Sequence, residues 1–540
     1  MMHLQWLQNP VETCCPICGE TGEKQAVLST DHVLAGHGPV TLVRCPCGVA
    51  FLLDQNPPDY EHGLIETLDY YVEQGAGIDL IVEPLLRLAP GTVRRCLEVG
   101  CSYGFALDFG RFAFGWEVLG VDPSPLAEMG SEALGLPVHG GYFDADLDLG
   151  PEPFDLALCS EVVEHLAQPR ALLSALRERL SGDGLLVLST PNLAVIRPET
   201  EEGALRRAVS PGFHLVLYDA ASLARLLESA GFSPVRIEES PETLRAFAGV
   251  SEAALQGVLP AVPPDRRGIL RGYFRERAAA APPGSPLACG FAYRHFKECV
   301  NAGRYEEAVA SRELLTRVWR EGYGLDLERP ETVTAALASG RSWAGAGRLP
   351  FNVTGALFFS GILELNHLGN PGRAAESFAA AAAAGDALVR SQQPFGLADG
   401  ETEALLRQSR KHLPMALAAT DPDRAVREVE ALESHPTGDA GFLDGTRAQT
   451  FIRLVNAGAY EAAQRLAPGI SRRIDSLGAK ASREDLDSLF CLGMLALLRR
   501  RSAEAAELFG RVRRLGTPEH DADLLESARR HEELSRWQAR

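Results

Sequence analysis

Four cysteines near the start of the chain have side chains and spacing that suit a metal ion. They form two short pairs, Cys15 with Cys18 and Cys45 with Cys47, and a glycine follows each pair. Tetrahedral Zn²⁺ takes four ligands, and two thiolates at short spacing can come from one backbone turn. The metal would also supply folding energy that so small a segment cannot obtain from a core. We therefore expect a structural zinc site of the zinc-ribbon kind.

Other residues are alternative zinc ligands at this site, because the second pair is C-x-C where C-x-x-C is usual. Cys14, His32 and His37 are substitutes for one of the four cysteines. Free thiols in a loop are the simplest alternative to a metal site. A catalytic zinc is disfavoured, since four thiolates leave no open coordination position.

A glycine-rich turn is the second chemical signal. An apolar run at residues 95–99 is followed by Gly100 and Gly104, and the next apolar run ends at Asp122. Glycines permit a tight turn and a close approach of the backbone to a ligand. A carboxylate at the tip of the second strand can accept hydrogen bonds from both hydroxyls of a ribose. This spacing predicts a nucleoside-containing cofactor, with a plain strand–turn–helix unit as the simplest alternative.

The elements that must position these groups divide the chain into four parts. Residues 1–57 are rich in Cys, Gly and Pro and predict the zinc-binding module. Residues 58–245 alternate short apolar runs with longer amphipathic ones, which is typical of a parallel α/β sheet. Residues 246–289 predict a linker or helical connection. Residues 290–540 carry Ala, Leu, Glu and Arg at helical spacing and predict an all-helical domain.

The last part carries a weak internal repeat. Its marker is a small alanine that follows a turn and starts a helix, at Ala308, Ala374, Ala425, Ala462 and Ala505. The intervals are irregular, whereas a strict tetratricopeptide repeat has a period of about 34 residues. We expect a degenerate tetratricopeptide-like solenoid, with a generic helical bundle as the alternative. Because solenoids present long concave faces, this region is expected to bind a protein partner or to form a homodimer.

Charge and composition argue against several classes of function. The 540 residues include 53 basic and 72 acidic side chains, for a net charge of −19. Such a chain is a poor general binder of phosphate backbones, so we expect no nucleic-acid partner. The sequence contains no apolar run of about 20 residues, so we expect no membrane span. The first residues lack a signal-peptide pattern, and we expect a cytoplasmic protein.

The ordered motifs of residues 93–240 resemble those of the class I S-adenosylmethionine-dependent methyltransferases. LEVGCSYG at 97–104 is similar to the first motif of that family, and GVDPS at 120–124 to the second. The segment 154–166, FDLALCSEVVEHL, resembles the fourth-strand motif of one large subgroup, and 180–192 resembles its fifth strand. The resemblance implies an α/β Rossmann-like domain with a mostly parallel seven-stranded sheet.

The resemblance also implies S-adenosylmethionine as the cofactor and places residues around it. Glu98 would face the methionine end, Asp122 would bind the ribose, and a residue of the Phe143-Asp144 pair would cap the adenine. Ser102 stands where the family usually has glycine, and we expect its φ to stay negative so that the cofactor still binds. The cofactor-binding candidates are Glu98, Gly100, Ser102, Gly104, Asp122, Pro123, Phe143, Asp144 and Ser160.

A hydroxyl is a poor nucleophile at neutral pH, so a base near pH 7 helps methyl transfer, and histidine is the natural candidate. His165 follows the predicted fourth strand and His214 the fifth, with Glu164 beside them as a possible orienter. Both histidines are expected at the carboxyl edge of the sheet, where such folds bind ligands. The alternative for His165 and Glu164 is an ordinary place in the first turn of a helix. The candidates for contact with the acceptor are Tyr70, Tyr71, Glu161 and Asn192, of which the tyrosines are also ordinary packing residues.

The order of the parts narrows the function that the resemblance implies. Sugar methyltransferases, including sugar C-methyltransferases, are similar to this chain in placing a small zinc-binding module before the methyltransferase domain. We therefore expect methyl transfer to a hydroxyl, or an activated carbon, of a sugar-like or natural-product small molecule, including a sugar nucleotide or glycan. The all-helical region departs from that pattern. It keeps two alternatives open, which are methylation of a protein docked on this region and a non-catalytic scaffold that retains the cofactor-binding fold.

Overall fold

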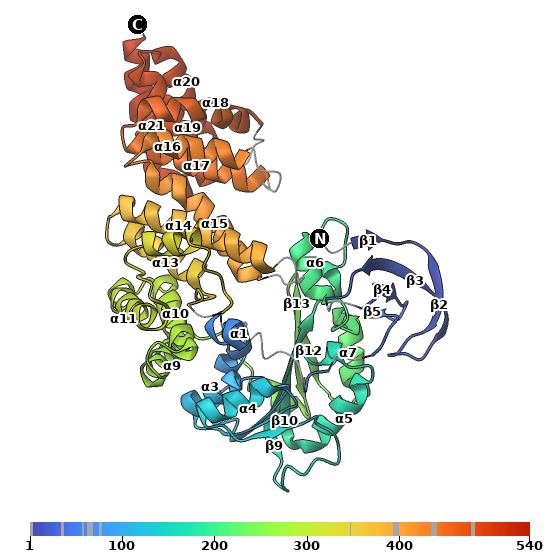
Figure 1. Cartoon of the computed structure of the whole chain (residues 1–540). Coiled ribbons are helices and arrows are strands. Elements are labelled where there is room, and N and C mark those ends of the chain that lie inside the picture. The colour runs from blue at the N-terminus through green and yellow to red at the C-terminus, as the bar shows by residue number, and fades with distance from the viewer. Residues whose placement is uncertain are drawn as a thin grey trace.

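The computed structural model describes residues 4–33, 37–56, 59–61, 68–74, 78–345, 347–392, 399–433, 440–476 and 481–539. Within these ranges the chain forms a small β-sheet, a larger sheet flanked by helices, and a long array of helices (Figure 1). The predicted boundary between residues 57 and 58 lies outside the described residues.

The larger sheet contains seven strands. They are β6 (Arg95–Val99), β7 (Glu117–Asp122), β8 (Val138–Gly140), β9 (Phe154–Ser160), β10 (Leu180–Pro191), β12 (Val235–Glu239) and β13 (Thr243–Gly249). Their order is β12-β13-β10-β9-β6-β7-β8. Strands β6 to β10 pair in parallel, and β13 is antiparallel to both β10 and β12. The predicted mostly parallel, seven-stranded sheet is confirmed.

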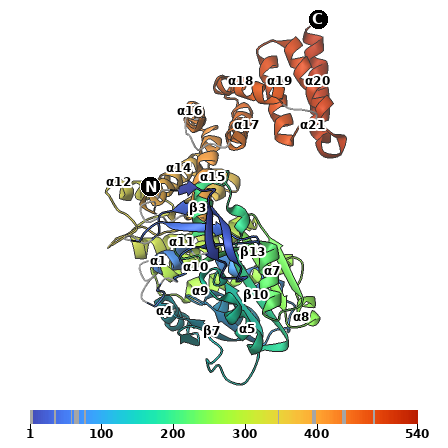
Figure 2. The same ribbon diagram turned by 90° about the vertical axis from the view of Figure 1, so that its right-hand side faces the viewer.

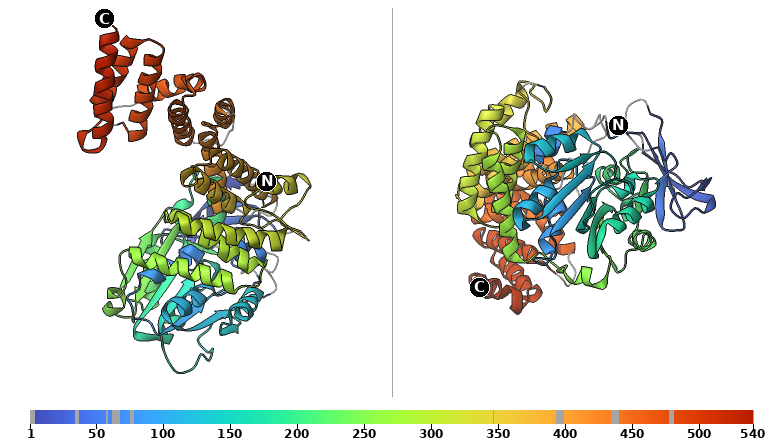
Figure 3. Two further views of the ribbon diagram at one scale, coloured as in Figure 1. Left: turned by 90° about the vertical axis from the view of Figure 1, so that its left-hand side faces the viewer. Right: turned by 90° about the horizontal axis from the view of Figure 1, so that it is seen from below.

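This sheet is buried on both faces, because alternate residues of a strand point to opposite sides. In β9, Leu156 and Leu158 pack into one core, whereas Ala157 and Cys159 pack into another. The first core contains helix α3 (Phe105–Phe114) and continues into the helical array. The second contains α5 (Pro169–Arg179) and α7 (Ala220–Ser229) and continues into the small sheet. Figure 3 (right) shows the large sheet between the helical array and the small sheet.

The small sheet belongs to the predicted zinc module but is not closed within it. Its N-terminal strands are β1 (Leu4–Trp6), β2 (Pro10–Cys14), β3 (Thr21–Thr30), β4 (Val40–Arg44) and β5 (Val49–Leu52). The sixth strand, β11 (Val216–Tyr218), comes from the second part of the chain and pairs antiparallel with β5. The module and the larger domain therefore share one sheet.

The helical array starts with α9 (Arg267–Ala280) and continues in antiparallel pairs. The further helices are α10 (Pro286–Asn301), α11 (Tyr305–Tyr323), α12 (Glu331–Ala338), α13 (Val353–Asn366), α14 (Pro371–Gln392), α15 (Gly400–Leu417), α16 (Pro422–Glu433), α17 (Ala440–Asn456), α18 (Tyr460–Ser476), α19 (Arg483–Leu498), α20 (Ser502–Leu515) and α21 (Pro518–Gln538). The five repeat alanines lie near the starts of α11, α14, α16, α18 and α20, and all are buried. Each of these five helices packs against the helix before it, as a small residue at that position permits. In Figure 2 the last helices of the array extend away from the sheets.

The remaining elements link these parts. Helices α1 (Leu68–Gln74) and α2 (Ile78–Val82) and the turn η2 (Leu85–Arg87) precede β6, whereas α4 (Pro125–Leu134), α6 (Glu202–Val209) and α8 (Glu252–Gln256) connect later strands. The short 3-10 turns are η3 (Val163–His165), η4 (Leu193–Val195) and η5 (Pro264–Arg266). Strand β13 runs past the boundary proposed at residue 245. Among the described residues, no helix has the length and apolar character needed to cross a bilayer.

Candidate functional site

The glycine-rich turn joins β6 to α3 at the carboxyl end of the large sheet. Gly100 has a φ of +75° and Gly104 a φ of +82°, in the left-handed region that favours glycine. A Cβ atom at Gly100 would collide with the Val162 side chain, and one at Gly104 would lie 2.6 Å from Leu136 Cδ1. Both positions therefore need glycine for the backbone conformation and for the close packing around it.

The expected negative φ at Ser102 is wrong, because this residue has a φ of +46°. An L-amino acid in the left-handed region carries a cost of about 1–2 kcal/mol. The Ser102 N–H donates to Asp122 Oδ2 at 2.7 Å, which holds the strained turn in place. Asp122 Oδ1 accepts from the backbone N–H and the hydroxyl of Ser124, at 2.8 and 2.6 Å. The acid at the tip of β7 thus ties the turn to the neighbouring strand.

Glu98 lies in β6 beneath this turn and is 4% exposed. Its Oε2 atom has no hydrogen-bond partner among the described residues. Burial, followed by the nearby Asp122 carboxylate, raises the pKa of Glu98 to about 8. A positively charged group would relieve such a carboxylate, and the methionine end of S-adenosylmethionine carries positive charge. The groups around the turn therefore fit that cofactor.

Tyr70 and Tyr71, two of the predicted acceptor contacts, lie on α1 and point in different directions. Tyr71 stacks on Phe105 with ring centroids 5.8 Å apart, and its hydroxyl interacts with the Ser102 side chain. Burial raises the pKa of Tyr71 to about 12. Tyr70 instead packs edge-on against Phe351 in the helical array, with centroids 5.4 Å apart. The structure brings Tyr71 to the glycine-rich turn and places Tyr70 elsewhere.

The segment after β8 holds the predicted adenine-side residues. Phe143 is buried in the second core, and Asp144 is exposed with its Oδ1 accepting the Asp146 N–H at 2.9 Å. Tyr142 is 55% exposed, and its pKa is raised by partial burial and then by nearby acids that include Asp122. Tyr142 was not among the residues predicted from the sequence, although its place directly before the Phe143-Asp144 pair was a usable signal.

A second group of predicted residues lies beyond the tip of β9. Ser160 ends that strand and is half-buried, as is Pro123 beyond the tip of β7. Glu161 has a left-handed φ of +55° and an exposed side chain, and its Oε1 accepts the Ser189 hydroxyl at 2.8 Å. Non-glycine residues seldom adopt this conformation, and backbone strain of this kind clusters at functional sites.

Glu164, in η3, is fully buried beside the imidazole of His165. Its Oε2 accepts the Thr190 hydroxyl at 3.0 Å. Its Oε1 has no hydrogen-bond partner among the described residues and lies 3.9 Å from His165 Nε2. Burial, followed by the neighbouring Glu161, raises the pKa of Glu164 well above its usual range. The buried carboxyl group therefore holds a proton more readily than an ordinary glutamate.

His165 and His214 lie against each other, with ring centroids 4.8 Å apart. His165 Nδ1 is 2.9 Å from the carbonyl oxygen of Phe213, and His214 Nδ1 is 2.8 Å from that of Ala208. A carbonyl oxygen only accepts, so both Nδ1 atoms carry the proton in these bonds and each Nε2 keeps a lone pair. Burial lowers the pKa of His165 to about 4 and that of His214 to about 3. Both rings are therefore neutral at pH 7.

Tyr60 also belongs to this group, although it was not among the residues predicted from the sequence. Its hydroxyl lies 2.7 Å from His165 Nδ1, and its ring stands edge-on to His165 and Phe213. Burial raises the pKa of Tyr60 above its usual value, so the hydroxyl keeps its proton at pH 7. No local spacing pattern links residues 60 and 165, so only the fold brings them together.

The histidine pair and Glu164 form a compact set of possible ligands. Each of the three side chains offers one ligand atom, and these atoms lie within 4.8 Å of one another. Two imidazole nitrogens and a carboxylate oxygen suit a divalent transition-metal cation. The carbonyl groups that accept from both Nδ1 atoms would hold the rings in place for such an ion. The same arrangement suits proton transfer at either Nε2.

Asn192 was predicted to contact the acceptor, but the hydrogen-bonding groups of its side chain are all bonded within the protein. It is 1% exposed, and its Nδ2 donates to Glu239 Oε1 at 3.2 Å and to the Ser240 carbonyl at 2.8 Å. Its Oδ1 accepts the Ala194 N–H at 2.9 Å and so caps the turn η4. Both amide hydrogens are already bonded, so the structure does not bring Asn192 to the histidine pair as a free donor.

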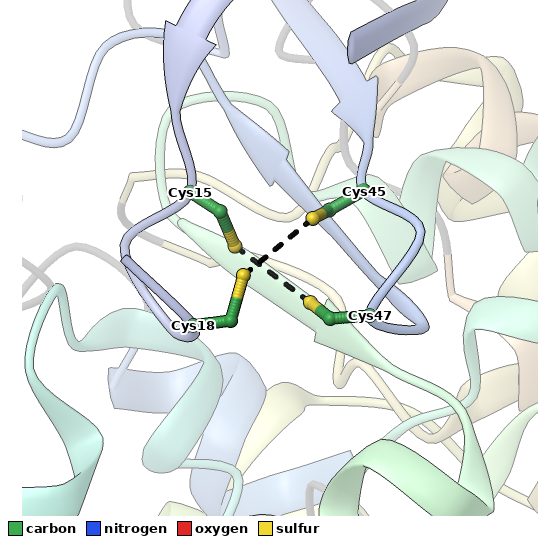
Figure 4. Close-up of side chains that lie close together, drawn as sticks. All are labelled: Cys15, Cys18, Cys45 and Cys47. Carbon is green, nitrogen blue, oxygen red and sulfur yellow. Dashed lines mark hydrogen bonds between the residues drawn. The ribbon is translucent and has the colours of Figure 1, made fainter. Parts of the chain in front are cut away.

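The four predicted zinc ligands converge from two loops of the small sheet (Figure 4). The Sγ atoms of Cys15 and Cys47 are 3.8 Å apart, as are those of Cys18 and Cys45, and all four lie within 4.8 Å of one another. Burial raises the pKa of Cys15 to about 11, so a cation would be needed to hold it as a thiolate. Four cysteines in this arrangement fit tetrahedral Zn²⁺.

The alternative ligands lie outside this group of four. The Cys14 side chain is exposed, and its sulfur is 3.5 Å from the Gly19 carbonyl oxygen. His32 and His37 stack on each other, with ring centroids 4.4 Å apart. Among the described residues, the four ligands are therefore Cys15 and Cys18 with the C-x-C pair of Cys45 and Cys47.

Comparison with known proteins points to one chemistry. Residues 60–237 match the family described as "Methyltransferase domain". A ubiquinone biosynthesis O-methyltransferase from Ruegeria sp. (strain TM1040) is 32% identical over 180 residues, which are 31% of this chain and 71% of that protein. The enzyme of the same name from Cereibacter sphaeroides (strain ATCC 17025 / ATH 2.4.3) is 38% identical over 131 residues, 23% of this chain and 51% of that protein.

A solved structure is also similar to part of the chain. It is that of an O-methyltransferase family protein from Burkholderia thailandensis, with 15% identity and a TM-score of 0.29. The similarity covers 36% of this chain and 65% of that one.

Proposed function

The chain belongs to the S-adenosylmethionine-dependent methyltransferases, and on that premise we propose that it methylates a hydroxyl group of a sugar-like small molecule. The observation that carries the proposal is the pair of neutral histidines beside Glu164 at the carboxyl end of the sheet. The name O-methyltransferase that the two curated relatives bear supports oxygen as the acceptor atom.

The cofactor would lie across the tips of β6 and β7. The turn from Gly100 to Gly104 would offer the close backbone approach, Asp122 would face the ribose, and Glu98 would face the methionine end. The bound cofactor supplies an electrophilic methyl group on a sulfonium. What remains for this chain is to orient the acceptor hydroxyl, to exclude water and to accept a proton.

His165 is the preferred base, because it is half-buried whereas His214 is only 8% exposed. As the acceptor oxygen would bond to the methyl carbon and the bond between that carbon and the sulfonium sulfur would break, the hydroxyl proton would pass to Nε2 of His165. The products are a methyl ether, S-adenosylhomocysteine and an imidazolium whose charge develops 3.9 Å from Glu164 Oε1. His214 supports the ring of His165, and Tyr60 contacts its Nδ1.

A polar acceptor suits the groups that surround this base. Glu161 is exposed and close to Glu164, and Ser160 ends the strand that leads to it. Carboxylate and hydroxyl groups bind the hydroxyls of a sugar or sugar nucleotide. The second candidate is an intermediate of ubiquinone biosynthesis, which the names of the relatives favour.

The test measures S-adenosylhomocysteine formed by the zinc-loaded full chain with two acceptor panels. One panel holds sugar nucleotides and the other catechols, and a third arm uses cell extract to detect transfer to protein. We expect turnover with a sugar nucleotide, a loss of at least a hundredfold in kcat for His165→Ala, and no change for His520→Ala, an exposed residue on α21. Turnover only with catechols or only on protein would replace the sugar proposal. Unchanged kcat for His165→Ala would refute its role as the base.

A further inference from the structure

Helix α1 carries a buried carboxylate, and both of its oxygens accept hydrogen bonds from the helical array. Glu73 is 0% exposed. Its carboxylate accepts from the Tyr323 hydroxyl, from the Phe351 N–H at 2.7 Å, and from two guanidinium nitrogens of Arg348 at 3.1 and 2.5 Å. All of these donors belong to the segment from α11 to the start of α13. The side chain is thus anchored in a part of the chain about 250 residues away.

Other groups of α1 make the same connection. Arg348 also pairs with Asp69 at 2.9 Å, and the Asn352 side chain donates to the Glu73 carbonyl at 3.1 Å. The Gln74 amide donates to Asp399 Oδ2, just before α15, at 3.0 Å. A seven-residue helix has little stability of its own, so these contacts hold α1 in place.

The approach of α1 to the helical array is close. A Cβ atom at Gly290 of α10 would collide with the Val72 carbonyl oxygen, so only glycine permits this contact. The adjacent Arg294 donates to the same carbonyl oxygen at 3.3 Å. Figure 1 shows α1 between the helical array and the large sheet.

The opposite side of α1 reaches the glycine-rich turn. Tyr71 stacks on Phe105 and contacts the Ser102 side chain. Phe105 itself packs edge-on against Phe291 of α10, with ring centroids 5.7 Å apart. One short helix therefore connects the helical array to the backbone turn at which the cofactor would bind.

We propose that Glu73 is a positioning residue for the cofactor, and that the helical array is a structural part of the cofactor site. Anchored by Glu73, α1 holds Tyr71 over the Ser102 turn and closes that side of the site. The inference rests on the proposed placement of S-adenosylmethionine at this turn. It gives the helical array a role in the reaction in addition to any partner that it binds.

The expected effect follows from the population of the closed arrangement. When the binding-competent state is populated only in part, the apparent Kd rises by the reciprocal of that fraction. Loss of the Glu73 charge removes its pairing with Arg348 and leaves buried donors without their acceptor. If α1 then keeps its place about one tenth of the time, the Kd for S-adenosylmethionine rises about tenfold.

The experiment compares four full-length proteins by calorimetric titration with S-adenosylmethionine, at a temperature where all are folded. Glu73→Gln tests the anchor. Glu364→Gln is the matched control, because Glu364 is also buried and pairs with Arg312 at 2.6 Å inside the helical array, away from α1. Asp122→Asn tests the placement of the cofactor. Hydrogen exchange of residues 68–74 with and without cofactor follows α1 directly.

We expect a Kd about tenfold higher for Glu73→Gln and an unchanged Kd for Glu364→Gln. Without cofactor, exchange in 68–74 should be faster in Glu73→Gln than in the native protein and in Glu364→Gln, and cofactor should slow it most in Glu73→Gln. If Glu73→Gln does not fold, Tyr323→Phe removes one donor to Glu73 while keeping the ring, and a Kd raised about threefold is expected. An unchanged Kd in the anchor variant overturns the inference. An unchanged Kd for Asp122→Asn shows instead that the cofactor binds elsewhere.

Discussion

The raised pKa of Glu98 predicts that cofactor binding depends on pH. Without cofactor this buried carboxyl group titrates at about 8, because burial and the Asp122 carboxylate disfavour its charge. It is therefore protonated over most of the range below pH 8. A cofactor with positive charge at its methionine end favours the ionised form, so binding releases a proton and strengthens as the pH rises toward 8.

The magnitude follows from the linkage between binding and ionisation. If the bound cofactor restores an ordinary pKa of about 4.3 to Glu98, the binding constant rises nearly tenfold per pH unit below pH 8 and levels off above it. Between pH 6 and pH 8 the gain is about fiftyfold, or about 2.3 kcal/mol. At pH 7, binding releases about 0.9 proton from Glu98.

The assay is calorimetric titration with S-adenosylmethionine from pH 6 to pH 9, in buffers with different ionisation enthalpies. Glu98→Gln keeps the size of the side chain and removes the titration, whereas Glu117→Gln changes an exposed acid of the neighbouring strand. The α-amino group of the free cofactor titrates near pH 8, and this titration is the same in every experiment. The difference between native protein and Glu98→Gln therefore isolates Glu98. The reasoning is refuted if Glu98→Gln retains the fiftyfold gain, or if the two proteins release the same number of protons.

Three further changes test other parts of the site. Cys18→Ser should abolish stoichiometric zinc in elemental analysis and lower the Tm by several degrees. Cys14→Ser should change neither the zinc content nor the Tm. Zinc loss in Cys14→Ser would show that the ligand set is wrong. Ser102→Gly should be more stable than Ser102→Ala in urea unfolding by about 0.5–1 kcal/mol, because both variants lose the hydroxyl that contacts Tyr71 and only glycine relieves the left-handed strain. A glycine variant that is no more stable than the alanine variant would contradict the strain. His214→Gln should lower kcat by about tenfold to a hundredfold and leave the Kd for cofactor unchanged, since the side chain supports His165 and lies away from the glycine-rich turn. A weaker cofactor affinity with full kcat would instead assign His214 to the cofactor site.

Local patterns in the sequence predicted the parts of the site that lie within one or two turns of chain. The pair Cys15 and Cys18 spans a single turn, and Gly100 and Gly104 span a single loop, so spacing alone records their geometry. The parallel sheet was predicted for a similar reason, because its strand motifs follow one another in order along the chain.

The remaining features depend on contacts between distant segments, which spacing does not record. Tyr60 meets His165 across 105 residues, and Glu73 meets Arg348 across 275. Ser102 was expected at negative φ so that serine could stand in place of glycine, yet its N–H bond to Asp122 holds it at +46°. Each of these was settled by tertiary contacts that outweigh local preference.

The shared small sheet also bears on how the protein is made. Strand β5 ends at Leu52, but its partner β11 starts at Val216, so about 165 residues must be synthesised before the two can pair. At roughly 5–20 residues per second, the edge of β5 waits about 10–30 s for its neighbour. An unpaired edge is a template for wrong pairing with other chains. Early zinc binding at the cysteine loops would hold β2 to β5 in register during that interval, so zinc supply during translation should govern the yield of folded protein.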